Sequence, residues 1–167
     1  MTVETNPLLS PSTLPYALPD FGRIRAEHYL PAFRQGFDEQ LAEIRRITMV
    51  RSMPTFENTL EALERSGELL DRVAHAFYTV SSADATAEIQ AIDEELAPLF
   101  AAHQDAITLD GQLYWRVQQV FDQRDSLGLD PEQRYLVERH HREMTHAGAG
   151  LDDEAKAWLA ERGYDKL

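Results

Sequence analysis

Apolar residues recur every three or four positions along most of this chain, the spacing of one face of an amphipathic helix. Such stripes run over residues 29–44, 56–80, 89–107, 113–121 and 135–144, and a weaker one covers Leu151–Arg162. No run alternates with a period of two for long enough to demand a strand. The pattern predicts an all-α fold of about six helices in an antiparallel helical bundle.

Capping residues mark the predicted helix ends. Thr55 follows a helix break and is placed to cap the second long helix. Asp110 can cap a later helix, which we expect Gly128 to end. The run Asp130-Pro131-Glu132-Gln133 has the order of an N-cap, a proline at the first helical position and a glutamine at the third, which is a capping box. We expect the glycines at 148 and 150 to interrupt the helix that follows.

Three residues inside the stripes predict local irregularities. Pro31 falls in about the first turn of its helix, where its missing N–H does little harm. Gly67 lies in the middle of a predicted helix at a cost of about 1 kcal/mol relative to alanine, which indicates a close helix contact. Pro98 is expected to kink the helix that contains it.

The first 25 residues form an extended, Pro-rich leader, because they contain four of the eight prolines and proline fixes φ and lacks an N–H. The apolar residues between the prolines indicate that the leader packs on the rest of the chain; they are Leu8, Leu9, Leu14, Tyr16, Leu18 and Phe21. We therefore divide the chain into a leader, residues 1–25, and a helical domain, residues 26–167.

Composition and charge narrow the classes of function. A chain of 167 residues with 43% hydrophobic residues can bury a globular core. Its 29 acidic and 16 basic side chains give a net charge of −13, which argues against nucleic-acid and membrane partners. The sequence has no cysteine, no signal peptide and no membrane-spanning run, and we expect a cytoplasmic protein.

Acidic residues are concentrated between Thr55 and Asp110, where twelve acids stand against only Arg65 and Arg72. One interpretation is a pair of helices with solvated outer faces. The other is an acidic wall that favours cationic peptides in a channel. The sequence does not separate the two.

The six histidines require a metal site to be considered. His140, His141 and His146 form the nearest cluster, but no two histidines are four residues apart, and two arginines lie among them. We expect ordinary pairing on a helix surface there. We expect His75 and His103 to be hydrogen-bonded residues of the core or its boundary.

No other catalytic arrangement occurs in the sequence. It has no cysteine nucleophile, no G-x-S-x-G elbow and no glycine-rich phosphate loop. Neighbouring carboxylates such as Glu94 and Glu95 point in different directions on a helix, so a shared-proton pair is not expected. We expect this chain by itself to be inactive, with no catalytic residue and no bound metal or other cofactor.

A resemblance to one enzyme family rests on six strings of residues: NPLL at 6–9, STLPY at 12–16, AEHYLPAF at 26–33, FENTLEALERSGELLDRV at 56–73, DGQLYWRV at 110–117 and RDSLGLD at 124–130. In this order and at these spacings the chain resembles the amino-terminal part of the thimet oligopeptidase family of zinc metallopeptidases. It is most similar to the bacterial peptidyl-dipeptidase (dipeptidyl carboxypeptidase) branch, and next to oligopeptidase A. The resemblance covers residues 6 to about 155.

This resemblance implies a longer, clam-shaped helical enzyme that cleaves short peptides and releases dipeptides from their carboxyl ends. It implies a zinc ion held by an H-E-x-x-H motif and a later glutamate in a C-terminal catalytic domain. That motif is missing from this sequence, so no zinc-binding or catalytic residue can be carried over. The chain would then be a non-catalytic N-terminal domain that forms part of the channel wall. Its docking face toward the missing domain would be exposed, and two copies could pair through it.

From about Asp152 the sequence departs from the family pattern and stops without a helix cap, which we interpret as an isolated N-terminal domain. Two alternatives stay open. The chain could be a free-standing helical binding or scaffold protein without enzymatic activity. It could also be a small helical metal or peptide binder that uses His140, His141 and His146.

Overall fold

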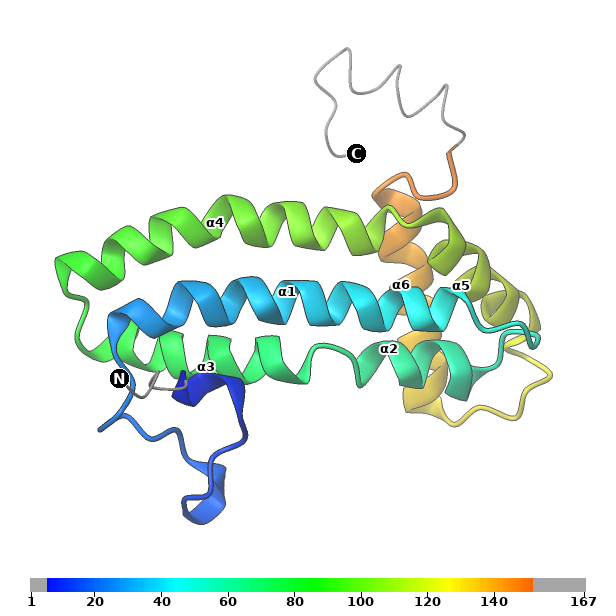
Figure 1. Cartoon of the computed structure of the whole chain (residues 1–167). Coiled ribbons are helices and arrows are strands. Elements are labelled where there is room, and N and C mark those ends of the chain that lie inside the picture. The colour runs from blue at the N-terminus through cyan, green and yellow to red at the C-terminus, as the bar shows by residue number, and fades with distance from the viewer. Residues whose placement is uncertain (1–5, 152–167) are drawn as a thin grey trace. The chain divides into compact units, whose positions relative to one another are not determined.

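The computed structural model describes residues 6–151, in which every regular element is a helix and no strand occurs. Two short 3-10 helices precede the main helices (Figure 1). Because the elements of this range are all helices, the all-α prediction is confirmed. The elements are η1 (Pro7–Leu9), η2 (Pro15–Ala17), α1 (Ala26–Thr48), η3 (Phe56–Glu61, with π-type hydrogen bonds), α2 (Ala62–Glu64), α3 (Glu68–Ala83), α4 (Ala87–Thr108), α5 (Gly111–Gln123) and α6 (Pro131–His146). The helix expected from Leu151 to Arg162 lies outside the described residues.

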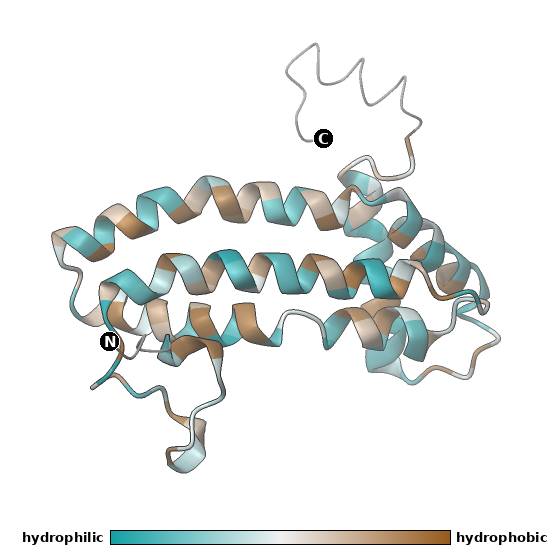
Figure 2. Cartoon of the chain, in the orientation of Figure 1, coloured by the Kyte–Doolittle hydropathy of each residue, from teal (hydrophilic) through white to brown (hydrophobic). Residues whose placement is uncertain are grey.

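The chain divides into two compact units. The first contains the residues up to Glu43 together with Gly67–His103, and the second contains Ile44–Ser66 together with the residues from Gln104 onward. Helices α1 and α4 therefore contribute residues to both units. Each helix of the two units carries both apolar and polar residues, as Figure 2 shows.

Unit 1 is built from antiparallel helices around an aromatic core. In this unit α3 runs in the opposite direction to α1 and α4 (Figure 1). Phe33 lies at the centre of the core, with ring centroids of Phe77 and Phe100 each 5.5 Å away in edge-to-face geometry. Tyr29 and Phe37 extend the cluster along α1, at 5.1 Å from Phe77 and 5.0 Å from Phe100. The 3.6-residue period of the first stripe thus places these rings on one buried face.

Unit 2 has an aliphatic core. Helices α5 and α6 pack against each other and against η3. The buried residues at their centre are Ile44, Phe56, Leu60, Leu113, Val117, Val120, Val137 and Met144. Each unit therefore has a hydrophobic core of its own.

The predicted N-caps are confirmed. The Thr55 side chain accepts from the backbone N–H of Asn58, and the Asn58 side chain accepts from the Thr55 N–H in return. Asp110 accepts from the N–H groups of Gln112 and Leu113. Asp130 and Gln133 form the expected capping box at the start of α6. These contacts satisfy N–H groups that a helix start would otherwise leave without a partner.

The prediction of one uninterrupted helix from Thr55 to Val80 is wrong. The helix stops after Glu64 and restarts at Glu68, because Gly67 takes a left-handed conformation with φ of +85°. Its N–H donates to Glu43 Oε2 at 2.7 Å. The close contact expected at this glycine is present, since a Cβ atom there would lie 2.5 Å from Gln40 Nε2.

Two other helix details differ from expectation. Helix α5 ends at Gln123, so Gly128, with φ of +66°, belongs to the following turn and does not end the helix. Helix α1 begins at Ala26, which places Pro31 in its second turn. Pro98 lies inside a continuous α4, and the kink expected there stays a prediction.

The leader was predicted to be extended and packed on the domain, and its residues differ in burial. Leu8 and Ile24 are buried. Between them Tyr16 is 97% exposed and Leu18 56% exposed, because the chain turns outward through η2. The leader is therefore fixed near its two ends.

No helix in the described range 6–151 is both long and apolar enough to cross a membrane.

Candidate functional site

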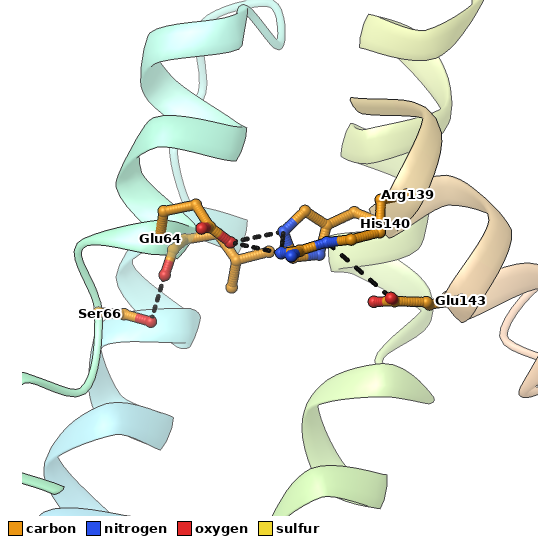
Figure 3. A network of polar contacts seen from close by, with 6 residues as sticks. Glu64, Ser66, Arg139, His140 and Glu143 are labelled. Carbon is orange, nitrogen blue, oxygen red and sulfur yellow. Dashed lines mark hydrogen bonds and ion pairs between the residues drawn. The ribbon is translucent and has the colours of Figure 1, made fainter. Parts of the chain in front are cut away.

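Charged side chains of α2 and α6 meet in unit 2 (Figure 3). His140 Nε2 lies 2.7 Å from Glu64 Oε1, and Arg139 Nη2 lies 3.2 Å from the same oxygen. Arg139 also reaches Glu143, at 3.9 Å between Nε and Oε1. One carboxylate thus accepts from two neighbouring residues of α6. This arrangement holds the two helices together, and the arginine on the shared oxygen disfavours a metal cation at that carboxylate.

His141 points to a different set of partners. Its ring stacks on Phe121, with centroids 3.8 Å apart and planes 10° apart, and its Nε2 lies 2.7 Å from Gln118 Oε1. The Arg124 guanidinium carbon lies 3.9 Å from the centroid of the same phenyl ring. Burial lowers the pKa of His141; the charge of Asp122 opposes this shift, and the charge of Arg124 adds to it. The imidazole is therefore part of an aromatic stack whose burial favours its neutral form.

The three histidines considered as a metal set are not brought together. His140 bonds to Glu64 and His141 to Gln118, while His146 is exposed at the end of α6. No group of three histidine, cysteine, aspartate or glutamate side chains in residues 6–151 is placed to hold a metal ion. The three histidines thus do not form a metal site in the part of the chain that the structure describes.

Two of the remaining histidines, His75 and His103, differ from each other. His103 is buried in unit 1, with Nε2 2.7 Å from Gln40 Oε1, which confirms its prediction as a hydrogen-bonded core residue. Burial lowers the pKa of His103 below 6.5. His75 lies on the exposed face of α3, so its prediction as a core or boundary residue is wrong.

Arg116 is a buried cation that sequence reasoning missed. It is 2% exposed on α5, and its Nη1 and Nη2 donate to the carbonyl of Val50 at 3.0 Å and to Asn58 Oδ1 at 2.7 Å. Burial lowers its pKa. The sequence did contain an indication of this burial, because Arg116 lies on the apolar stripe, three residues after Leu113.

The acidic residues between Thr55 and Asp110 are mostly exposed in both units, which fits solvated outer faces. In unit 1, Glu95 pairs with Arg34 at 2.8 Å on the surface. An exposed pair of this kind contributes at most about 1 kcal/mol. This exposure does not test whether the acidic residues face a substrate channel, so that interpretation stays a proposal.

Comparisons with known proteins support the resemblance seen in the sequence. No family model matches the chain. It is 44% identical over 154 residues, 92% of its length, to the dipeptidyl carboxypeptidase of Escherichia coli (strain K12), and 44% identical over 157 residues to that of Salmonella typhimurium. It is 25% identical over 157 residues to oligopeptidase A of Escherichia coli (strain K12). The chain spans 23% of the length of both carboxypeptidases and 22% of oligopeptidase A, in their N-terminal part. The predicted similarity to these two groups of peptidases is confirmed.

Proposed function

We propose that this chain is the N-terminal, non-catalytic domain of a zinc peptidyl-dipeptidase that hydrolyses short peptides and releases C-terminal dipeptides. The observation that carries the proposal is 44% identity to a dipeptidyl carboxypeptidase across 92% of the chain. The zinc motif H-E-x-x-H does not occur in this sequence, so zinc and the reaction are assigned to the catalytic domain of the longer enzyme. We also propose a cytoplasmic location and a boundary between leader and helical domain after residue 25.

The role we assign to the chain is structural: its helices form part of the wall of the substrate channel. Exposed carboxylates of α3 and α4, such as Asp71, Glu88 and Glu94, support an acidic wall that attracts cationic peptides. In a full-length enzyme, replacing these three by neutral amides should raise KM for a lysine-rich tetrapeptide. It should leave kcat and the KM for a neutral tetrapeptide unchanged. Equal effects on both substrates would contradict the acidic wall.

The assignment of the reaction to a missing domain can be tested directly. The DNA after codon 167 is sequenced, and the chain and any longer reading frame are purified. We expect an H-E-x-x-H motif in the same frame, and dipeptide release that a chelator abolishes and zinc restores. The 167-residue chain should release no dipeptide and bind no stoichiometric zinc. Chelator-sensitive dipeptide release by the short chain would overturn the proposal.

A free-standing helical binding or scaffold protein is the second candidate. The observation that favours it is that each unit has a buried hydrophobic core of its own. A stop codon shortly after codon 167, with no H-E-x-x-H motif downstream in frame, would favour this candidate over the first.

We further propose that the isolated chain pairs with a second copy through an exposed docking face. In unit 2, Met49 is 78% exposed and Met53 is 65% exposed, on a segment held by the Arg116 bond to Val50. Large exposed apolar side chains on a fixed segment are typical of an interface. Sedimentation should detect a dimer that Met49→Ser with Met53→Ser converts to a monomer. A monomer at every concentration would contradict this pairing.

A further inference from the structure

The leader forms a closed loop on unit 1. Leu8 and Ile24 are its two buried ends, and the Asn6 side chain donates to the carbonyl of His28 at 2.8 Å. From Leu9 to Arg23 the chain swings away from α3 and returns, with η2 at the outer end of the loop (Figure 1). Compact surface loops whose ends lie close together are frequently functional.

The loop and α3 together line a cavity of about 220 Å³ that is open to solvent on one side. Arg72 and Ala76 of α3 line it from the helix side, and Pro11, Ala17 and Asp20 line it from the loop side. Pockets for drug-sized ligands measure about 300 to 1,000 Å³. The cavity therefore suits a smaller molecule, of the size of an amino acid or a dipeptide.

The cavity carries charged groups whose hydrogen-bonding capacity is only partly used by residues 6–151. Arg72 Nε is buried, with no acceptor among the described residues. The other two nitrogens of its guanidinium have only long contacts, 3.4 Å to the carbonyl of Leu8 and 3.8 Å to Glu68. Arg23 and Asp20 also line the cavity, and neither has an ion-pair partner within residues 6–151. A guanidinium with free donors preferentially binds a carboxylate. A free carboxylate, in turn, preferentially binds an ammonium group.

The loop backbone is strained beside the cavity. Tyr16 and Ala17 have φ of +59° and +53°, and they are the non-glycine residues with positive φ among those described. Ala17 lines the cavity. Such conformations cost about 1 to 3 kcal/mol each and concentrate at ligand-binding segments. The strain supports a binding role for this loop and does not by itself indicate the ligand.

We propose that this cavity binds a small zwitterion, an amino acid or dipeptide, with its carboxylate on Arg72 and Arg23 and its ammonium group on Asp20. Two cations and one anion line the cavity, so the carboxylate is the dominant recognition group. The apolar walls formed by Pro11, Ala17 and Ala76 accept a small side chain. The site lies in unit 1 and does not depend on peptidase activity, so it stands or falls separately from the proposed function.

The test is a titration of the ¹⁵N-labelled 167-residue chain, followed by NMR, with three probes of similar size. L-Alanyl-L-alanine carries both charges, N-acetyl-L-alanine only the carboxylate, and L-alaninamide only the ammonium group. We expect saturable shifts confined to residues 8–24 and 72–76, tightest for the dipeptide, weaker for the acid, and absent for the amide. Shifts of equal size with all three probes, or no saturable shift at these residues, would overturn the proposal.

Variants separate the two charged contacts. Arg72→Met should weaken dipeptide binding about tenfold or more. Asp20→Asn should weaken the affinity for the dipeptide several-fold and leave the affinity for N-acetyl-L-alanine unchanged. The control is Arg34→Met, which removes a surface cation of the same unit that pairs with Glu95, and it should change neither affinity. If Arg72→Met fails to fold, the proposal is tested by titrating Asp20→Asn with the dipeptide and with N-acetyl-L-alanine. An unchanged dipeptide affinity in that variant would contradict the ammonium contact.

Discussion

The buried guanidinium of Arg116 provides the sharpest test of how unit 2 is held together. Its two donors join α5 to the Val50 carbonyl and to Asn58, so one side chain fixes the segment that follows α1 and the start of η3. The perturbation is Arg116→Met, which keeps an unbranched side chain of similar length and removes the donors and the charge.

The magnitude follows from what the substitution leaves without a partner. A hydrogen bond to a charged donor contributes about 1.5 to 3 kcal/mol. Asn58 Oδ1 keeps two other donors, the Thr55 N–H at 2.8 Å and the Thr59 hydroxyl at 2.9 Å, so it does not become unpaired. Val50 is 37% exposed, and water can reach its carbonyl. Removal of a buried charge also returns part of its desolvation penalty. We therefore expect a net loss of about 2 kcal/mol, below the sum of two such bonds.

The assay is urea unfolding followed by the fluorescence of Trp115, a residue of α5 in unit 2, in a Trp158→Phe background that leaves it the sole tryptophan. With a slope of about 2 kcal/mol per molar urea, a loss of 2 kcal/mol lowers the midpoint by about 1 M. Arg116→Lys should lower it by about half as much, because an ammonium group cannot reproduce the two-pronged geometry.

The matched control is Arg142→Met, which removes an exposed arginine of α6 in the same unit. It should change the free energy of unfolding by less than about 0.5 kcal/mol. If Arg116→Met and Arg142→Met have the same midpoint, the buried guanidinium does not stabilise unit 2 and the reasoning fails.

Three further predictions concern single residues and use the same unfolding measurement. Gly67→Ala should destabilise by about 1 to 3 kcal/mol, because φ is +85° and the new methyl group would meet the Gln40 amide, whereas Gly111→Ala, with open space around it, should not destabilise. Burial lowers the pKa of His103, so the unfolded chain takes up a proton first and stability falls as the pH drops below 6.5. His103→Gln should therefore lose less stability than the parent between about pH 7.5 and pH 5, and an equal loss would contradict this. Asp130→Ala should cost about 1 kcal/mol through the lost cap of α6, and no change would argue against the capping box.

The sequence predicted most of the fold where the controlling interactions are local. A helix cap depends on residues within four positions of one another, so Thr55, Asp110 and Asp130 could be identified from residue type and spacing. The buried faces of α1 and α5 follow from the period of the α-helix for the same reason. The similarity to dipeptidyl carboxypeptidase was likewise carried by linear strings of residues.

The candidate site depended on residues that are distant in sequence. The partner of His140 is Glu64, 76 positions away, and the partner of Arg116 is Asn58, 58 positions away. The pattern around each residue says only that it lies on a helix face. It does not say which carboxylate or amide faces it.

The residue pattern alone was enough to predict that this chain is helical, where most of its helices begin and which peptidases it resembles. The break at Gly67 became visible only in the folded chain, because it depends on Glu43 and Gln40 of α1. The packed structure also shows that the middle of the leader is exposed and that the leader lines an open cavity next to Arg72. The physical reason is the same in both cases: short-range hydrogen bonds and periodicity are encoded in neighbouring residues, whereas burial and partner choice arise when separate helices pack against one another.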